Sequence, residues 1–218
     1  MASQQHWSTS LFGPKILTKP KTTGVPTASA LSGKSIVALY FSASWCPPCK
    51  AFTPILADFY NANKDNMEIV FLSSDRDEES FSGYFAKMPW LSSVPGYSGG
   101  DANMRQRKLA EMFKIQGIPT LIILDGKTGN YITDNGRTQV MGATSDESKR
   151  ALIESWKSIE AVPVEQAVFS SGSSSWIGSL LMFIAKNPVY LFGTLYFVKR
   201  FFRYLERLGE GDDEPKEL

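Results

Sequence analysis

Residues 35–49 read SIVALYFSASWCPPC, in which an apolar run leads directly into two cysteines separated by two prolines. The run Ile36–Phe41 has the continuous apolar character of a β-strand that is covered on both faces. Cys46 and Cys49, the only two cysteines in 218 residues, then fall where this strand gives way to a helical pattern. The stretch therefore predicts a strand-to-helix junction that carries a pair of thiols.

A thiol at the start of a helix can act as a nucleophile. The first turn offers unpaired N–H groups and the positive end of the helix dipole, and both stabilise a thiolate. In a C-x-x-C motif the pKa of such a cysteine falls from about 8.5 into the range of roughly 3.5 to 7.5. We expect Cys46, nearer the helix start, to attack a substrate disulfide, and Cys49, one turn deeper, to resolve the mixed disulfide.

Two other roles for the cysteine pair compete with redox exchange. A zinc site needs four ligands, usually Cys or His, and the chain adds only one histidine, His6. A structural disulfide between Cys46 and Cys49 would close a very short loop and gain little stability from it. Thiol–disulfide exchange is the favoured interpretation.

Composition limits the class of protein. A chain of 218 residues can bury one domain and still carry an appendage. Its net charge of +1 argues against a nucleic-acid-binding surface, which usually has a clear basic excess. Two cysteines in one motif fit a reducing compartment better than a secreted disulfide framework.

The rest of the chain alternates strand and helix patterns. Further buried strands are predicted at Met67–Ser73 and Thr120–Leu124, and one or two exposed strands between Tyr131 and Met141. Apolar residues at helical spacing predict helices at Asp75–Met88, Asn103–Phe113 and Ser145–Ile159. This order predicts an α/β fold with a mixed central sheet flanked by helices.

Three motifs resemble the tryparedoxin and nucleoredoxin branch of the thioredoxin superfamily. They are the run FSASWCPPCK with the following FTP (residues 41–54), KMPW (87–90) and GIPTL (117–121), and the resemblance covers residues 11–159. It implies a thioredoxin fold and dithiol–disulfide exchange at Cys46 and Cys49 as the redox-active disulfide. It further implies that Pro119 is a cis proline packed beside the cysteines, with the backbone of Ile118 receiving substrate.

The resemblance also suggests substrate-binding residues and partners. Trp45 and Pro47 would form the substrate surface beside Ile118 and Pro119, and Arg137 would hold the substrate, unless it is a solvated strand residue. The implied reductant is a low-molecular-weight dithiol such as trypanothione, and the implied clients are peroxiredoxins. No metal, flavin or nucleotide site is visible, so we expect no cofactor, and we expect a monomer. The alternative is a redox-sensing adaptor, like nucleoredoxin, that gates a protein partner.

Two positions depart from the thioredoxin pattern. Thioredoxins carry a buried acid six residues before the first cysteine, and this chain has Tyr40 there. By resemblance to the family, Asp75 is the residue that would take the place of this missing acid. The simpler alternative is that Asp75 caps the N-terminus of a helix.

The C-terminal part predicts a membrane anchor. We expect a redox domain at 1–161, a flexible linker at 162–175, a transmembrane helix at 176–198 and a charged tail at 199–218. The span holds one charge, Lys186, and basic residues follow it, which favours the mitochondrial outer membrane or the endoplasmic reticulum, with the redox domain in the cytosol. Two short interfacial helices, or an extension packed on the core, are the alternatives.

Overall fold

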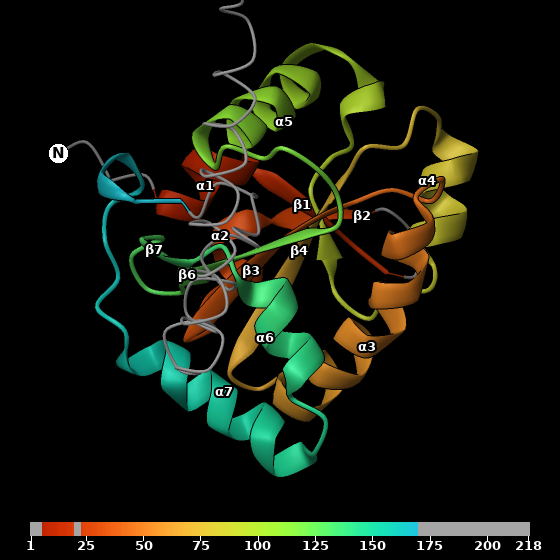
Figure 1. The fold of residues 1–218 in the computed structure, drawn as a ribbon. Coiled ribbons are helices and arrows are strands. Elements are labelled where there is room, and N and C mark those ends of the chain that lie inside the picture. Colours follow the sequence, from red (N-terminus) through yellow and green to blue (C-terminus); the bar gives the residue numbers. More distant parts are fainter. Residues whose placement is uncertain (1–5, 20–22, 170–218) are drawn as a thin grey trace, which may run out of the picture. The chain divides into compact units, whose positions relative to one another are not determined.

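The computed structural model describes residues 6–19 and 23–169 (Figure 1). The predicted transmembrane helix at 176–198 and the tail at 199–218 lie outside these residues. Within the described part, no helix is both long and apolar enough to cross a membrane.

The strands are β1 (Lys15–Thr18), β2 (Thr23–Pro26), β3 (Ile36–Ser42), β4 (Met67–Ser73), β5 (Leu91–Ser92), β6 (Thr120–Asp125) and β7 (Tyr131–Thr133). The α-helices are α1 (Trp7–Phe12), α2 (Thr27–Ala30), α3 (Pro47–Asn63), α4 (Glu78–Phe85), α5 (Gly100–Met112), α6 (Gly136–Gly142) and α7 (Asp146–Ser158). Two short 3₁₀ helices, η1 (Gly96–Ser98) and η2 (Val164–Gln166), are the remaining elements of the described residues.

All seven strands form one mixed sheet in the order β2-β1-β5-β4-β3-β6-β7. The central strand β3 is parallel to β4 and antiparallel to β6. Every residue of β3 and β4 is buried, which explains why these two strands are largely apolar along their length rather than alternating, although β4 also buries Glu68. The predicted mixed central sheet, flanked by helices, is confirmed.

Successive side chains of the sheet point to opposite faces and pack into two separate cores. One core joins the sheet to α3, α4, α6 and α7 and contains Tyr40, Phe71 and Trp156. The other joins it to α1 and α5 and contains Phe12 and Phe113. Figure 1 shows α3, α6 and α7 on one side of the strands and α1 and α5 on the other.

Some element boundaries differ from the sequence predictions. The helix expected from Asp75 begins only at Glu78, because the Asp77 side chain accepts the N–H of Ser80 and caps the first turn. The exposed strands expected up to Met141 reduce to β7, and the helix α6 follows. The last helix begins as predicted, since Ser145 and Ser148 form a reciprocal capping box.

The boundary predicted after Ala161 is too early. Val162 forms an antiparallel bridge with Tyr131 on β7, with N–H···O distances of 2.9 and 2.8 Å. Val164 and Phe169 pack against the core on the α5 side of the sheet. Residues 162–169, which we call the strap, therefore belong to the folded domain rather than to the predicted linker at 162–175, because their apolar side chains cover core surface.

Candidate redox site

The cysteines lie at the carboxyl end of the central strand. β3 ends at Ser42, and α3 begins at Pro47, so the loop between them presents Cys46 at the helix start. Thr120, the first residue of β6, pairs with Phe41 across the sheet. This register brings the residues before Thr120 to the same edge, beside the cysteine loop.

Cys46 and Cys49 form a disulfide, with their Cα atoms 5.2 Å apart. Cys46 is the N-cap residue of α3, and its Sγ accepts the backbone N–H of Cys49 at 3.3 Å. Cys46 is 4% exposed and Cys49 is completely buried, so of the two sulfurs Cys46 is the one that a substrate can reach. The order that the sequence predicted, with Cys46 nearer solvent and Cys49 deeper, matches this geometry.

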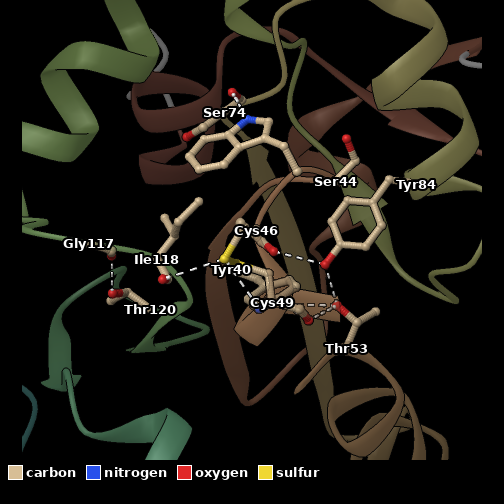
Figure 2. The surroundings of a disulfide bond; sticks show 12 residues. Tyr40, Ser44, Cys46, Cys49, Thr53, Ser74, Tyr84, Gly117, Ile118 and Thr120 are labelled. Carbon is tan, nitrogen blue, oxygen red and sulfur yellow. Dashed lines mark hydrogen bonds between the residues drawn. A yellow bond between two sulfur atoms is a disulfide. The ribbon is translucent and has the colours of Figure 1, made fainter. Parts of the chain in front are cut away.

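The predicted cis peptide bond is present between Ile118 and Pro119. The carbonyl oxygen of Ile118 lies 3.7 Å from Cys46 Sγ, opposite the buried side of the disulfide (Figure 2). Ile118 is half-buried and packs against both cysteines, whereas Pro119 is buried. The structure thus brings Ile118 and Pro119 to the sulfur that is nearer solvent.

Trp45 forms an exposed wall beside Cys46. Its side chain is 56% exposed, and its indole Nε1 donates to the carbonyl oxygen of Ser74 at 3.1 Å. Pro47, also exposed, follows Cys46 at the first position of α3. An apolar, rigid surface of this kind around a sulfur suits contact with the disulfide region of another molecule.

Asp75 is buried and holds the cysteine loop. Its carboxylate accepts the backbone N–H of Ser44 at 2.8 Å and the hydroxyl of Ser73 at 2.8 Å. It does not cap α4, because that role belongs to Asp77. The helix-cap alternative for Asp75 is therefore wrong. Its contact with Ser44, two residues before Cys46, makes it a residue that positions the cysteine loop.

Four buried hydroxyl groups form a hydrogen-bonded cluster next to Cys49, and Figure 2 shows those of Thr53 and Tyr84 on the side of the disulfide away from Ile118. They belong to Tyr40, Ser42, Thr53 and Tyr84, each at most 5% exposed. Burial raises the pKa of Tyr40, so its hydroxyl stays protonated. At the place where the thioredoxin pattern has an acid, this chain has an uncharged cluster.

The four hydroxyl groups form one hydrogen-bonded cluster against the backbone of Cys49. The Cys49 carbonyl oxygen lies 2.9 Å from the Thr53 hydroxyl and 3.4 Å from the Tyr40 hydroxyl, and it accepts from them because a carbonyl has no proton to donate. Thr53 is also hydrogen-bonded to Tyr40 at 2.9 Å and to Tyr84 at 2.6 Å. Tyr84 and Ser42 are hydrogen-bonded at 3.0 Å. The cluster thus anchors the turn that carries the deeper sulfur.

Arg137 lies on a helix, not on the exposed strand that the sequence predicted. It is the second residue of α6 and is half-buried. A Cβ atom on the preceding Gly136 would lie 2.7 Å from the carbonyl oxygen of Leu121, so α6 packs directly on the strand that follows the cis proline. The Nε of Arg137 is buried and has no hydrogen-bond partner among the described residues.

Sequence reasoning missed the Ser44–Asp75 contact and the hydroxyl cluster. The sequence shows Tyr40 only as the position that lacks the thioredoxin acid. Thr53 follows Cys49 by four residues, so helical spacing alone predicts that both lie on the same face of the helix. Tyr84 comes from another helix, and no local pattern places it there. The described residues contain no group of three or more His, Cys, Asp or Glu side chains that could hold a metal ion.

Comparison with known proteins supports the resemblance seen in the sequence. The family described as Thioredoxin-like matches residues 33–131. The chain is 41% identical over 121 residues to tryparedoxin of Trypanosoma brucei brucei, an alignment that covers 55% of this chain and 80% of the relative. It is 46% identical over 132 residues to nucleoredoxin of Danio rerio, covering 59% of this chain but only 29% of that protein.

Solved structures agree with these sequence comparisons. Tryparedoxin II from C. fasciculata superposes with a TM-score of 0.55 at 37% identity, over 62% of this chain and 86% of that one. A structure of tryparedoxin II complexed with glutathionylspermidine gives a TM-score of 0.52 at 39% identity, over 59% and 85% of the two chains. The fold, the cysteine pair and these similarities together show that the chain belongs to the tryparedoxin and nucleoredoxin branch of the thioredoxin-like proteins.

Proposed function

We propose that the protein is a thiol–disulfide oxidoreductase that works through Cys46 and Cys49. The observation that carries the proposal is the Cys46–Cys49 disulfide at the start of α3, with the more accessible sulfur facing the Ile118 carbonyl. After reduction, the Cys49 N–H and the helix terminus favour a thiolate on Cys46.

The exchange proceeds in two balanced steps. The Cys46 thiolate attacks one sulfur of the client disulfide, forms a mixed disulfide and releases the other client sulfur as a thiolate, which takes up a proton. The Cys49 thiolate then attacks Cys46 Sγ, which re-forms the Cys46–Cys49 disulfide and releases the client as a dithiol. A dithiol reductant restores the pair by the reverse sequence and becomes a disulfide itself.

The surface around Cys46 supplies the proposed substrate contacts. The Ile118 backbone, next to the cis Pro119, would align an extended client segment, and Trp45 and Pro47 would cover its apolar side chains. Arg137, by its resemblance to a tryparedoxin arginine, would hold an anionic group of the substrate.

For the reductant and the client we propose a low-molecular-weight dithiol such as trypanothione and a peroxiredoxin-type disulfide. The support is similarity alone: the tryparedoxin relative is covered over 80% of its length, and one tryparedoxin structure was solved with glutathionylspermidine. We further propose that the protein acts as a monomer, tethered to the mitochondrial outer membrane or the endoplasmic reticulum through residues 176–198, with the redox domain in the cytosol.

A second candidate is a redox-sensing adaptor. It is favoured by the nucleoredoxin relatives, to which the chain is 46% to 48% identical, although it spans only 29% and 25% of the two proteins compared. In this function the Cys46–Cys49 disulfide would switch the binding of a partner rather than turn over.

Turnover separates the two functions. The enzyme should reduce insulin disulfides catalytically, with dithiothreitol or trypanothione as electron donor. Comparing the two donors at equal thiol concentration tests the proposed reductant, because a dedicated site should favour trypanothione. An adaptor should show at most one turnover per Cys46–Cys49 pair.

A further inference from the structure

The strap, residues 162–169, crosses the face of the sheet that α5 covers. Val162 and Tyr131 form two backbone hydrogen bonds with each other, which join the strap to the edge strand β7. From there four side chains of the strap (Val162, Val164, Ala167 and Phe169) pack against the core that includes Phe113. The strap is thus attached at its start and carries an aromatic residue at its end.

The ring of Phe169 lies against the carboxyl end of α5. Its centroid is 6.2 Å from that of Phe113 and 4.9 Å from that of Tyr131, both in edge-to-face geometry. The Nζ of Lys114 lies 5.5 Å from the Phe169 centroid, a cation–π distance. Phe169 therefore contacts the two residues that follow the last turn of the helix.

Lys114 has an unusual backbone conformation. Its φ is +48°, the left-handed region, and it is the only described non-glycine residue with a positive φ. The next residue, Ile115, donates its N–H to the Ala110 carbonyl at 2.8 Å, which closes the end of α5. Glycine usually takes this position, because a side chain there crowds the backbone. Contacts that hold the Lys114 side chain, such as the one with Phe169, therefore help to keep the helix end closed.

The helix end leads directly into the loop that faces the sulfur. Four residues after Lys114 comes Ile118, whose carbonyl oxygen lies 3.7 Å from Cys46 Sγ. Ile115 and Ile118 both pack against the same core as Phe169. The loop 115–119 is therefore fixed at one end by α5 and the strap and at the other by the cis proline.

We propose that Phe169 is a positioning residue for the loop 115–119, and that the strap sets how well this loop receives a client. The inference rests on the proposed thiol–disulfide exchange. A client that binds the Ile118 backbone should be reduced less efficiently when Phe169 is lost, whereas the reduction of a small disulfide that contacts only Cys46 should be unaffected.

The test uses the full chain with Phe169→Ala, and with Val168→Ala as the matched control. Val168 is adjacent and 88% exposed, so its truncation changes the strap without touching α5. With insulin as client, Phe169→Ala should raise KM by about three- to tenfold, the size of effect that the loss of one aromatic contact produces, while kcat stays within about twofold. With a small aromatic disulfide as substrate, both variants should match the unchanged chain.

Hydrogen exchange gives a readout that does not depend on activity. In Phe169→Ala the amides of residues 115–118 should exchange faster than in the unchanged chain, and in Val168→Ala they should not. An equal loss on insulin and on the small disulfide would make Phe169 a general stabiliser and overturn the inference, as would an unchanged KM and unchanged exchange. If the unchanged chain reduces neither substrate, the proposed function fails, and the exchange measurement still decides whether the strap controls the loop.

Discussion

Replacing Asp75 with alanine should weaken the fold around the cysteine loop. Asp75 is 5% exposed, and its carboxylate accepts two hydrogen bonds, from the Ser44 N–H and from the Ser73 hydroxyl. Alanine leaves both donors without this acceptor. Asparagine is the matched control, because its side-chain oxygen can still accept the Ser44 N–H.

The size of the effect follows from these contacts. A hydrogen bond to a charged group contributes about 1.5–3 kcal/mol. The two bonds share one carboxylate and Ser44 is only half-buried, so we expect a combined loss of about 3 kcal/mol rather than the full sum. For a chain of this size each kcal/mol shifts Tm by about 2–4 °C, which gives a fall of about 6–12 °C for Asp75→Ala.

Thermal unfolding of the oxidised full chain followed by circular dichroism measures this shift. Asp75→Asn should lose less than half as much, and insulin reduction by Asp75→Asn should keep the pH profile of the unchanged chain. A Tm for Asp75→Ala within about 2 °C of the unchanged chain would refute the positioning role. Loss of one limb of the pH profile in Asp75→Asn would instead show that the acid moves a proton in the reaction.

Three further predictions concern other parts of the chain. Burial raises the pKa of Glu68 above its unfolded value, so the ionised side chain lowers the stability of the fold at neutral pH. This loss of stability disappears as the pH falls through the raised pKa. Glu68→Gln should therefore raise Tm at pH 7 but not below about pH 4, and an equal rise at both pH values would contradict the raised pKa. Gly136→Ala should lower the free energy of unfolding in urea by about 1–3 kcal/mol, because the added Cβ would lie 2.7 Å from the Leu121 carbonyl oxygen. An unchanged urea midpoint would show that α6 can move away from β6 without cost. In a carbonate extraction of membranes, the chain truncated after Ser175 should be released, with its specific activity on insulin unchanged, whereas the full-length chain should stay with the membranes. Release of the full-length chain by carbonate would argue against a spanning anchor.

The central strands and the cysteine site could be predicted because their signals are local. β3, β4 and β6 are covered on both faces, so each leaves a largely apolar run in the sequence. The cysteine motif lies within five residues, and its resemblance to a family placed Pro119 beside it. Trp90, the last residue of the KMPW motif, is buried in the core.

The missed elements depend on partners that are distant in sequence. β5 is only two residues long, and its pairing with Val70 and Phe71 of β4 defines it rather than any pattern of its own. α6 begins and ends with glycine, which disfavours helix, and it forms because Gly136 permits close packing on β6.

The contacts around the disulfide were hidden for the same reason. Ser42 and Tyr84 are 42 residues apart, and Ser44 and Asp75 are 31 residues apart. The strap reads as linker, since its apolar residues follow no helical or strand period. Only its contacts with Phe113 and Tyr131 show why Phe169 is partly buried.

The most direct test of the account is to trap the mixed disulfide with single-cysteine variants of the full chain. The variants Cys46→Ser and Cys49→Ser are each incubated with a disulfide client, and adducts are identified by mass spectrometry under non-reducing conditions. Because Cys46 is the more accessible sulfur and Cys49 is completely buried, Cys49→Ser should accumulate a client adduct on Cys46, and Cys46→Ser should form none and turn over no insulin. An adduct on Cys49 in Cys46→Ser, with none on Cys46 in Cys49→Ser, would contradict the assignment of nucleophile and resolving thiol.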